Sequence, residues 1–381
     1  MQIQAAVMLQ PGQIEIREFE KPTPTDDAFL LHVDNVGICG SDKHMYLGHT
    51  ALKFPVMPGH EVVGTVAEIG RHANQTMNVM GGPVKDGDKV TVVPGSKNCG
   101  KCYYCLRVPG RPTLCTGRTI YGFSNCETAP YLTGEFSEYT YIHGNSWVYK
   151  IPDGIPAEIS VLTEPVAVAT RAVERAFSPG LPHIGDGFGI GSRVAVLGCG
   201  PIGLLVIAVL RDSGAGTIIA TDVVDSRLEM AKQMGADVAI SVAETTPEAR
   251  VEQIQALTDG VGVDIAMECA GIPAVFSEAL DVVRRGGKVV EVGHYTDSGD
   301  TRVRPHQICN KDVDICGVWA YPQIQFQTAL DFLQRTRAPL RELITHHLPL
   351  QQLEAGIDML GQEGVYKVVI KPKQDGQDLQ D

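Results

Sequence analysis

The feature that most constrains the fold is a glycine-rich turn between an apolar strand and a helix. Residues 194–197 are apolar, and Gly198-Cys199-Gly200-Pro201-Ile202-Gly203 follows them directly. Asp222 ends the next apolar run, 19 residues after Gly203. A lone G-x-G-x-x-G also fits a simple packing turn, but strand, helix and acidic residue all stand in the required context here. The pattern predicts a dinucleotide site in a βαβ unit.

Each position in this turn has a physical role in such a site. Gly198 permits the tight turn, Gly200 lets the backbone approach a pyrophosphate, and Gly203 allows close helix packing. Pro201 and Ile202 open the helix, whose first amide groups and positive dipole end suit phosphate oxygens. We therefore expect these residues to contact the cofactor.

Asp222 indicates which dinucleotide is bound. Its carboxylate can accept hydrogen bonds from both ribose hydroxyls and repels a 2′-phosphate, and the next residue, Val223, offers no cation. NAD is therefore favoured over NADP. Arg227, one turn further on, is a further expected cofactor contact. The alternative is an aspartate that only caps a turn at the end of a strand.

The pattern of apolar runs divides the chain into two regions with different expected secondary structure. Residues 3–149 hold short β-rich runs broken by glycine and proline, whereas strands and helix-length segments alternate after Pro156. This alternation predicts an α/β fold, with a β-rich domain followed by a doubly wound parallel sheet. We expect two helices after Tyr321 and a strand at 365–371, a linker at 178–192, and a disordered polar tail at 374–381.

Four cysteines predict a structural zinc site. Cys99, Cys102, Cys105 and Cys115 have the spacing C-x2-C-x2-C-x9-C in a loop with polar flanks. Four thiolates can close a tetrahedral zinc shell with no open position. Four unrelated core thiols are the alternative, but no apolar periodicity accompanies these residues.

A second cluster has too few soft ligands to close a shell. Cys39 lies near the start of a Gly-Ser-Asp-Lys-His segment, and His60 and Glu61 follow a glycine 20 residues later. An incomplete shell is what a catalytic zinc needs, because substrate takes the open position. A cysteine or histidine taken alone at these positions would more often be structural.

Charge and hydropathy exclude several classes of protein. The 381-residue chain has a net charge of −13, which disfavours nucleic-acid and anionic-membrane partners. Its first residues lack the features of a signal peptide, and glycine and proline interrupt the one apolar stretch, 194–210. We expect a cytoplasmic enzyme that acts on a small molecule.

The motifs together resemble the medium-chain zinc-dependent alcohol dehydrogenase family. The resemblance covers nearly the whole chain and rests on the following segments: Cys39-Gly-Ser-Asp, Gly59-His-Glu-Val-Val-Gly64, the four-cysteine lobe, Thr163-Glu164-Pro165, the Gly198 turn and Lys367-Val-Val-Ile-Lys-Pro372. It implies a GroES-like catalytic domain with two zincs at 1–159, a Rossmann domain at 160–321, and a segment at 322–381 that returns to the catalytic domain. It also implies a substrate cleft between the domains and a homodimer or homotetramer.

The same resemblance assigns the catalytic zinc ligands. They are Cys39 and His60, with Glu164 at the position where the polyol and threonine dehydrogenase branch has glutamate. Glu61 would lie beside the metal and exchange with Glu164 as a ligand, and Asp42 would orient His60. The alternative for Glu164 is an acid that only stabilises a helix N-terminus.

Ser41 and His44 complete the expected site. By resemblance, Ser41 accepts the proton of the alcohol and passes it through the cofactor ribose to His44 and solvent. The alternative for His44 is an ordinary surface residue. One departure concerns substrate, because Ala320 precedes Tyr321 where polyol dehydrogenases of this family typically have arginine.

These observations predict a zinc-dependent, NAD-linked dehydrogenase that oxidises a small secondary alcohol, which is a polyol, a diol or a hydroxy amino acid. An L-threonine 3-dehydrogenase-like or a specialised biosynthetic alcohol dehydrogenase is the alternative within this chemistry. A metal-free reductase on the same fold would not need both zinc clusters. A cofactor-binding structural protein would not need Ser41 and His44.

Overall fold

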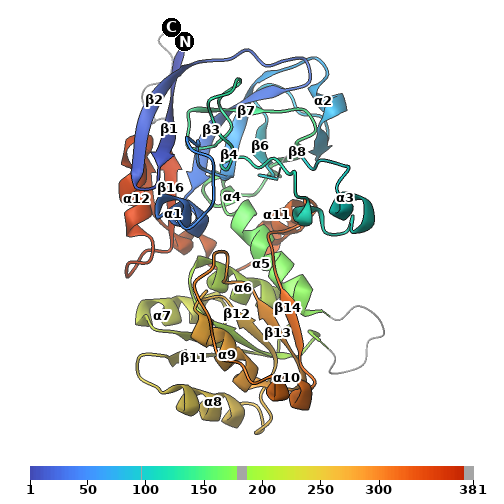
Figure 1. Cartoon of the computed structure of the whole chain (residues 1–381), viewed down its shortest axis with the longest axis vertical. Coiled ribbons are helices and arrows are strands. Elements are labelled where there is room, and N and C mark those ends of the chain that lie inside the picture. The colour runs from blue at the N-terminus through green and yellow to red at the C-terminus, as the bar shows by residue number, and fades with distance from the viewer. Residues whose placement is uncertain (96, 178–186, 373–381) are drawn as a thin grey trace. The chain divides into compact units, whose positions relative to one another are not determined.

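Two compact units make up the chain. The structure, a computed structural model, describes residues 1–95, 97–177 and 187–372 (Figure 1). Unit 1 comprises Met1–Glu164, Pro322–Arg335 and Leu340–Asp381, and unit 2 comprises Pro165–Tyr321 and Thr336–Pro339. Most of the expected linker at 178–192 and all of the expected tail at 374–381 lie outside the described residues. No helix among the described residues is long and apolar enough to cross a membrane.

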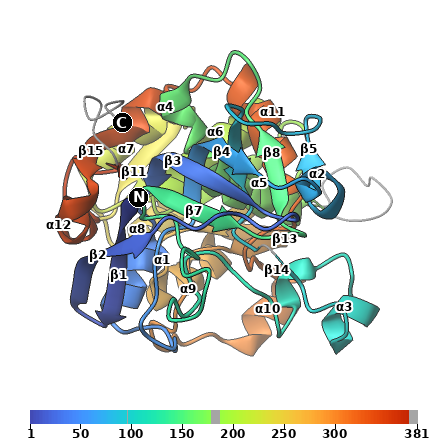
Figure 2. The same ribbon diagram turned by 90° about the horizontal axis from the view of Figure 1, so that it is seen from above.

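Unit 1 is built on an eight-stranded sheet with a separate two-stranded ribbon, β1–β2 (Figure 2). The strand order is β15-β16-β3-β4-β6-β8-β5, and β7 pairs with β3. Its strands are β1 (Gln2–Gln10), β2 (Gln13–Glu20), β3 (Phe29–Gly37), β4 (Glu61–Ile69), β5 (Asn78–Met80), β6 (Lys89–Val92), β7 (Tyr139–Ile142), β8 (Trp147–Lys150), β15 (Ile344–Pro349) and β16 (Lys367–Lys371). Its helices are α1 (Gly40–Tyr46), α2 (Ala73–Thr76), α3 (Tyr103–Arg107), η1 (Pro112–Leu114), α4 (Ala157–Ser160), α11 (Gln325–Arg335), η2 (Leu340–Leu343), η3 (Leu350–Gln352) and α12 (Leu353–Met359). Helix α5 (Thr163–Ala176) begins in unit 1 and continues into unit 2.

The C-terminal part of the chain completes the sheet of unit 1. Strand β16 pairs antiparallel with β3, so segments more than 300 residues apart in sequence become neighbours. Leu353, Ile357 and Val368 from this C-terminal part are buried in one core cluster with Phe29 and Val62. Their burial removes apolar surface from water and fixes β16 against the centre of the sheet. The sequence predicted β16 but missed β15, whose residues were not separated from the expected helices.

Unit 2 is a doubly wound parallel sheet. Its strand order, β11-β10-β9-β12-β13-β14, reverses direction between β9 and β12, as in Rossmann folds. The elements are β9 (Arg193–Leu197), α6 (Pro201–Asp212), β10 (Thr217–Asp222), α7 (Asp225–Met234), β11 (Val238–Ser241), α8 (Pro247–Ala256), β12 (Val263–Glu268), α9 (Pro273–Val282), β13 (Val283–Glu291), α10 (Pro305–Lys311) and β14 (Asp314–Gly317). The predicted combination of a β-rich domain with a doubly wound domain is confirmed.

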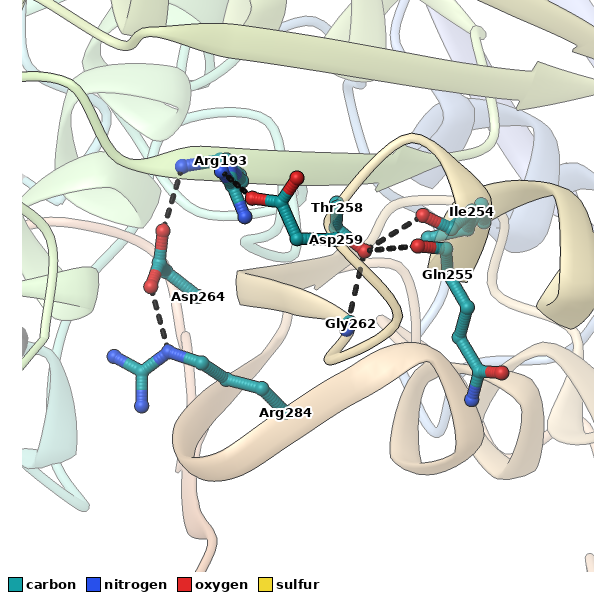
Figure 3. Close-up of polar contacts among 8 residues, drawn as sticks. All are labelled: Arg193, Ile254, Gln255, Thr258, Asp259, Gly262, Asp264 and Arg284. Carbon is teal, nitrogen blue, oxygen red and sulfur yellow. Dashed lines mark hydrogen bonds and ion pairs between the residues drawn. The ribbon is translucent and has the colours of Figure 1, made fainter.

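Polar side chains hold the amino ends of the strands in unit 2 (Figure 3). Asp264 accepts a hydrogen bond from the backbone N–H of Arg193 (2.7 Å) and one from Nε of Arg284 (2.6 Å), which joins β9, β12 and β13. The Thr258 hydroxyl accepts from the N–H of Gly262 (3.1 Å) and lies 2.7 Å from the Ile254 carbonyl oxygen. These contacts stabilise the amino ends of the strands, opposite the carboxyl edge at which ligands bind in doubly wound folds.

Candidate functional site

Three potential metal ligands converge in unit 1. Cys39 caps the N-terminus of α1, His60 precedes β4, and Glu61 is the first residue of that strand. One donor atom from each of the three lies within 4.8 Å of the others. His60 and Glu61 are buried and Cys39 is partly buried. A thiolate, an imidazole and a carboxylate suit a zinc ion and leave one position of a tetrahedral shell open.

Asp42 fixes the orientation of two members of this set. One carboxylate oxygen accepts a hydrogen bond from the Cys39 N–H (2.8 Å), and the other lies 3.6 Å from Nδ1 of His60. Both this second oxygen and Nδ1 are buried, and neither has a hydrogen-bond partner. Burial disfavours the charged ring, but Asp42 keeps the pKa of His60 well above its usual value. Nε2 of His60 is thereby the ring nitrogen available to a metal.

Glu61 is held by a buried lysine that the sequence analysis did not identify. Nζ of Lys367, on β16, lies 2.8 Å and 2.6 Å from the two carboxylate oxygens and 3.1 Å from the Ile38 carbonyl oxygen. Burial lowers the pKa of Lys367, but the charges of Glu61, Cys39 and Glu164 and the hydrogen bond to Glu61 together raise it above its usual value. Gly37 leaves room for this pair, since a Cβ there would lie 2.0 Å from Oε2 of Glu61.

Two further glutamates lie near this set. Glu164, in the first turn of α5, is buried, and its charge raises the pKa values of Lys367 and Glu135. In the described part of the chain, Glu164 is not among the donors within 4.8 Å of one another. Glu135 is fully buried, and neither carboxylate oxygen has a hydrogen-bond partner. Burial holds the pKa of Glu135 well above its usual value.

Ser41 lies at the metal-ligand set, whereas His44 does not. Oγ of Ser41 is 3.3 Å from Nε2 of His60, the nitrogen that faces the predicted metal. Nδ1 of His44 lies 3.1 Å from Nδ1 of His49 at a more exposed part of α1. Burial, followed by the charges of His49 and Lys43, lowers the pKa of His44. A proton path between Ser41 and His44 therefore remains a prediction.

The four-cysteine lobe forms a second converging set in unit 1. One Sγ atom from each of Cys99, Cys102, Cys105 and Cys115 lies within 4.8 Å of the others. Cys105 Sγ is 4.0 Å from that of Cys99 and 3.5 Å from that of Cys102, near the ~3.8 Å separation in a tetrahedral zinc–thiolate site. Backbone N–H groups lower the pKa of Cys102 to about 6, which favours the thiolate that binds metal.

The glycine-rich turn in unit 2 has the geometry of a dinucleotide site. Gly198 has φ +100°, and a Cβ there would lie 2.7 Å from the Ala270 backbone nitrogen. A Cβ on Gly203 would lie 1.9 Å from the Gly198 carbonyl oxygen, so only glycine allows this approach of helix and strand. Gly200, the N-cap of α6, has no atom near its Cβ position. That open space at a helix N-terminus fits a phosphate group.

Asp222 ends β10 beside this turn. Its carboxylate accepts hydrogen bonds from the N–H groups of Cys199 (2.7 Å) and Val224 (2.9 Å). Nη1 of Arg227 lies 3.8 Å from one carboxylate oxygen. The two backbone contacts fix the carboxylate at the carboxyl edge of the sheet, where the adenosine ribose of a dinucleotide binds. The donor sets in unit 1 fit two zinc ions, and the turn in unit 2 fits NAD.

Comparison with known proteins decides the family. A family model described as an alcohol dehydrogenase GroES-like domain matches residues 25–153, and one described as a zinc-binding dehydrogenase matches residues 201–335. The chain belongs to the zinc-dependent alcohol dehydrogenase family. It is an oxidoreductase of the sorbitol and polyol branch, and zinc and a nicotinamide dinucleotide are its cofactors.

Individual relatives cover nearly the whole chain. A sorbitol dehydrogenase of Bacillus subtilis is 33% identical over 93% of this chain and 93% of its own. An erythritol/L-threitol dehydrogenase of Mycolicibacterium smegmatis is 30% identical over 97% of this chain and 98% of its own. A solved alcohol dehydrogenase from Escherichia coli, in complex with NADH, is 28% identical, has a TM-score of 0.79 and covers 97% of this chain and 99% of its own.

Lys367 and Glu135 are the two site residues that sequence reasoning missed. Lys367 stands in the Lys-Val-Val-Ile-Lys-Pro segment, which was used only as evidence of resemblance. A lysine at the start of an apolar strand is a weak sign of a buried ion pair, because lysine is rarely buried without a partner. Glu135 follows a glycine in a polar loop, and nothing in that local pattern indicates complete burial.

Proposed function

We propose that this dehydrogenase oxidises a secondary alcohol of a short polyol or vicinal diol with NAD. The observation that carries the proposal is the incomplete ligand set of Cys39, His60 and Glu61, with the Ser41 hydroxyl 3.3 Å from the His60 ring. A bound zinc ion at such a set supplies a Lewis acid for the alcohol oxygen. A hydroxyl at this distance is placed to accept the alcohol proton.

We propose that Cys39 and His60 are constant ligands and that Glu61 and Glu164 share the third position. Glu61 is supported by its place in the converging set, and Glu164 by its burial nearby. The pair between Lys367 and Glu61 would hold Glu61 back when Glu164 binds the metal. Asp42 would keep the His60 ring in its ligating orientation.

For the cofactor, we propose that Asp222 selects NAD over NADP. Its carboxylate is held by two backbone N–H groups, so it cannot turn away from a 2′-phosphate without losing both hydrogen bonds. The guanidinium of Arg227 lies near the same carboxylate, which would partly neutralise its positive charge. We further propose that the turn at Gly198, Gly200, Pro201, Ile202 and Gly203 holds the pyrophosphate.

One observation supports a polyol substrate, and a second supports a short one. The relatives named above act on sorbitol and on erythritol or L-threitol, which are all polyols. Ala320 offers no cation for a distant hydroxyl, where arginine is typical of polyol dehydrogenases in this family. The hydroxy amino acid alternative is not favoured, because neither relative acts on one by name.

The test measures NADH formation with a panel of three-carbon to six-carbon polyols, vicinal diols and 3-hydroxy amino acids. We expect the highest kcat/KM with a short polyol or diol. Turnover of 3-hydroxy amino acids alone would overturn the substrate class. No turnover of any alcohol by zinc-loaded protein that binds NADH would favour a structural cofactor-binding protein.

We also propose a cytoplasmic homodimer or homotetramer. A site of four zinc-bound thiolates needs a reducing compartment, which supports the location. Light scattering coupled to size-exclusion chromatography measures the oligomeric state, and a monomer would contradict it.

A further inference from the structure

Unit 2 contains a pair of adjacent glutamates that the dehydrogenase chemistry does not use. Glu268 ends β12 and Glu291 ends β13, and the two are direct partners in the parallel ladder. Like charges at such positions repel one another. His294 follows β13 by three residues and completes a group whose donor atoms lie within 4.8 Å of one another.

Backbone N–H groups orient the carboxylate of Glu268 through one oxygen, and the other oxygen has no hydrogen-bond partner. It is fully buried, and Oε1 accepts hydrogen bonds from the N–H groups of Ala270 (2.9 Å) and Gly271 (2.8 Å). Oε2 is buried with no hydrogen-bond partner. An oxygen fixed in this way has the position and the free lone pairs of a preorganised metal ligand.

Glu291 and His294 present their donor atoms to this free oxygen. Nδ1 of His294 lies 2.6 Å from Oε1 of Glu291 and 3.5 Å from Oε2 of Glu268. Oε2 of Glu291 is also buried without a hydrogen-bond partner. Ligand atoms around a tetrahedral zinc ion with N and O donors are about 3.3–3.6 Å apart, so a small adjustment of His294 suffices.

Gly293 provides the space for this group. A Cβ at Gly293 would lie 2.5 Å from Oε2 of Glu268, so any other residue would cover that oxygen. Gly271, with φ +68°, lies after β12 and packs against the backbone of Gly293, which lies after β13. Two glycines thus keep space open beside the unpartnered Oε2 of Glu268.

The charge of the group calls for a cation. Within the described ranges, no lysine or arginine forms an ion pair with Glu268 or Glu291. Two ionised carboxylates carry a charge of −2, which one divalent ion balances when the imidazole is neutral. Buried charge is costly unless it is compensated in this way.

We propose that Glu268, Glu291 and His294 form a third metal site, which takes a divalent ion of the zinc, manganese or cobalt type. Two oxygens and one imidazole nitrogen suit these ions and are harder than the cysteine-containing sets in unit 1. The site lies beside the dinucleotide turn, because the next residue, Cys269, donates its N–H to the Leu197 carbonyl oxygen at 2.8 Å. The proposal does not depend on the substrate or on the ligands assigned in unit 1.

Metal content tests the proposal directly. Wild-type protein is equilibrated with excess Zn²⁺, passed through a desalting column and analysed by mass spectrometry for zinc per chain. We expect three zinc ions in the wild type and two in Glu291→Gln and in His294→Gln, each of which removes a ligand with little change in volume. Glu252→Gln, an exposed change on α8, is the matched control and should retain three.

Cobalt spectra identify which site loses its metal. Co²⁺ at the cysteine-containing sets gives thiolate charge-transfer bands, whereas the proposed site has no sulfur ligand. Loss of one Co²⁺ from the variants with unchanged thiolate bands supports the proposal. Three results would overturn the proposal. The wild type could saturate at two ions, both variants could retain three ions, or the thiolate absorbance could be lost together with the third ion. Absence of a third metal ion would not change the result of the dehydrogenase assay, so the metal-site proposal and the proposed function can fail independently.

Discussion

Replacement of Lys367 by methionine tests the role of the most buried ion pair near the catalytic ligands. Both oxygens of Glu61 lie within 2.8 Å of Nζ of Lys367, and both side chains are almost fully buried. Methionine keeps most of the aliphatic volume but removes the charge. Glu61 is then left as a buried carboxylate without a partner in the metal-free protein.

The size of the effect follows from what Glu61 can do in response. At an effective dielectric constant of ~20, unit charges 2.6 Å apart attract by about 6 kcal/mol, an upper bound before the cost of burial. A buried carboxylate without its partner takes up a proton instead. To protonate a carboxyl with an ordinary pKa of about 4.3 costs about 4 kcal/mol at pH 7 and about 1 kcal/mol at pH 5.

We therefore expect Lys367→Met to destabilise metal-free protein by about 4 kcal/mol at pH 7, within the 3–5 kcal/mol typical of a broken buried pair. For a cooperative unit of about 150–250 residues, this lowers Tm by roughly 8–16 °C, and at pH 5 by roughly 2–4 °C. Stability lost by the variant therefore grows as pH rises above the ordinary carboxyl range. Zinc should reduce the loss, because it offers Glu61 a new partner.

Differential scanning calorimetry at pH 5 and pH 7, with and without zinc, measures these shifts. Lys89→Met is the matched control, because Lys89 pairs with Asp34 at the surface and its side chain is 54% exposed. That change should cost no more than about 1 kcal/mol. The double variant Glu61→Gln/Lys367→Met should recover most of the lost stability. Equal Tm losses at pH 5 and pH 7, or a loss no greater than that of Lys89→Met, would refute the reasoning.

Three further predictions concern the zinc lobe, the cofactor and the proton path. Cys115→Ala should remove one zinc and lower Tm, because a closed zinc site contributes to folding; unchanged zinc content would show that Cys115 is not a ligand. Asp222→Gly should narrow the preference for NAD, measured as the ratio of kcat/KM values, by about tenfold or more, equivalent to ~1.4 kcal/mol. Equal use of NAD and NADP by the wild type would contradict this role. Ser41→Ala should lower kcat by about 100-fold or more with both unit 1 zincs retained, and His44→Ala should do less; normal turnover by Ser41→Ala would exclude the proposed path. Because burial lowers the pKa of His44, its ring stays neutral to a lower pH than that of an ordinary histidine. The fall of kcat at acid pH that depends on protonation of His44 should therefore lie below about pH 6.5.

The parts of the fold that the sequence predicted are those with local causes. The turn at Gly198 needs only its own glycines and the flanking apolar runs, and its strand and helix lie as predicted. The cysteines of the zinc lobe are close in sequence, so their spacing alone limits the geometry. Strand β15 was missed because its pairing with β16 is a long-range parallel contact. Its sequence, Ile-Thr-His-His-Leu-Pro, has no strict alternation that separates strand from helix.

Buried charges show why the rest of the site needed the structure. Glu61 and Lys367 are 306 residues apart, and only the pairing of β16 with β3 brings the ammonium to the carboxylate. The ladder of β12 and β13 brings Glu268 and Glu291 together in the same way, but no lysine or arginine accompanies them. The same rule, that a buried carboxylate needs compensation for its charge, therefore has different outcomes for Glu61 and for Glu268. For Glu61 the partner is a lysine from the C-terminal strand, and for Glu268 the compensation must come from a proton or from a metal ion.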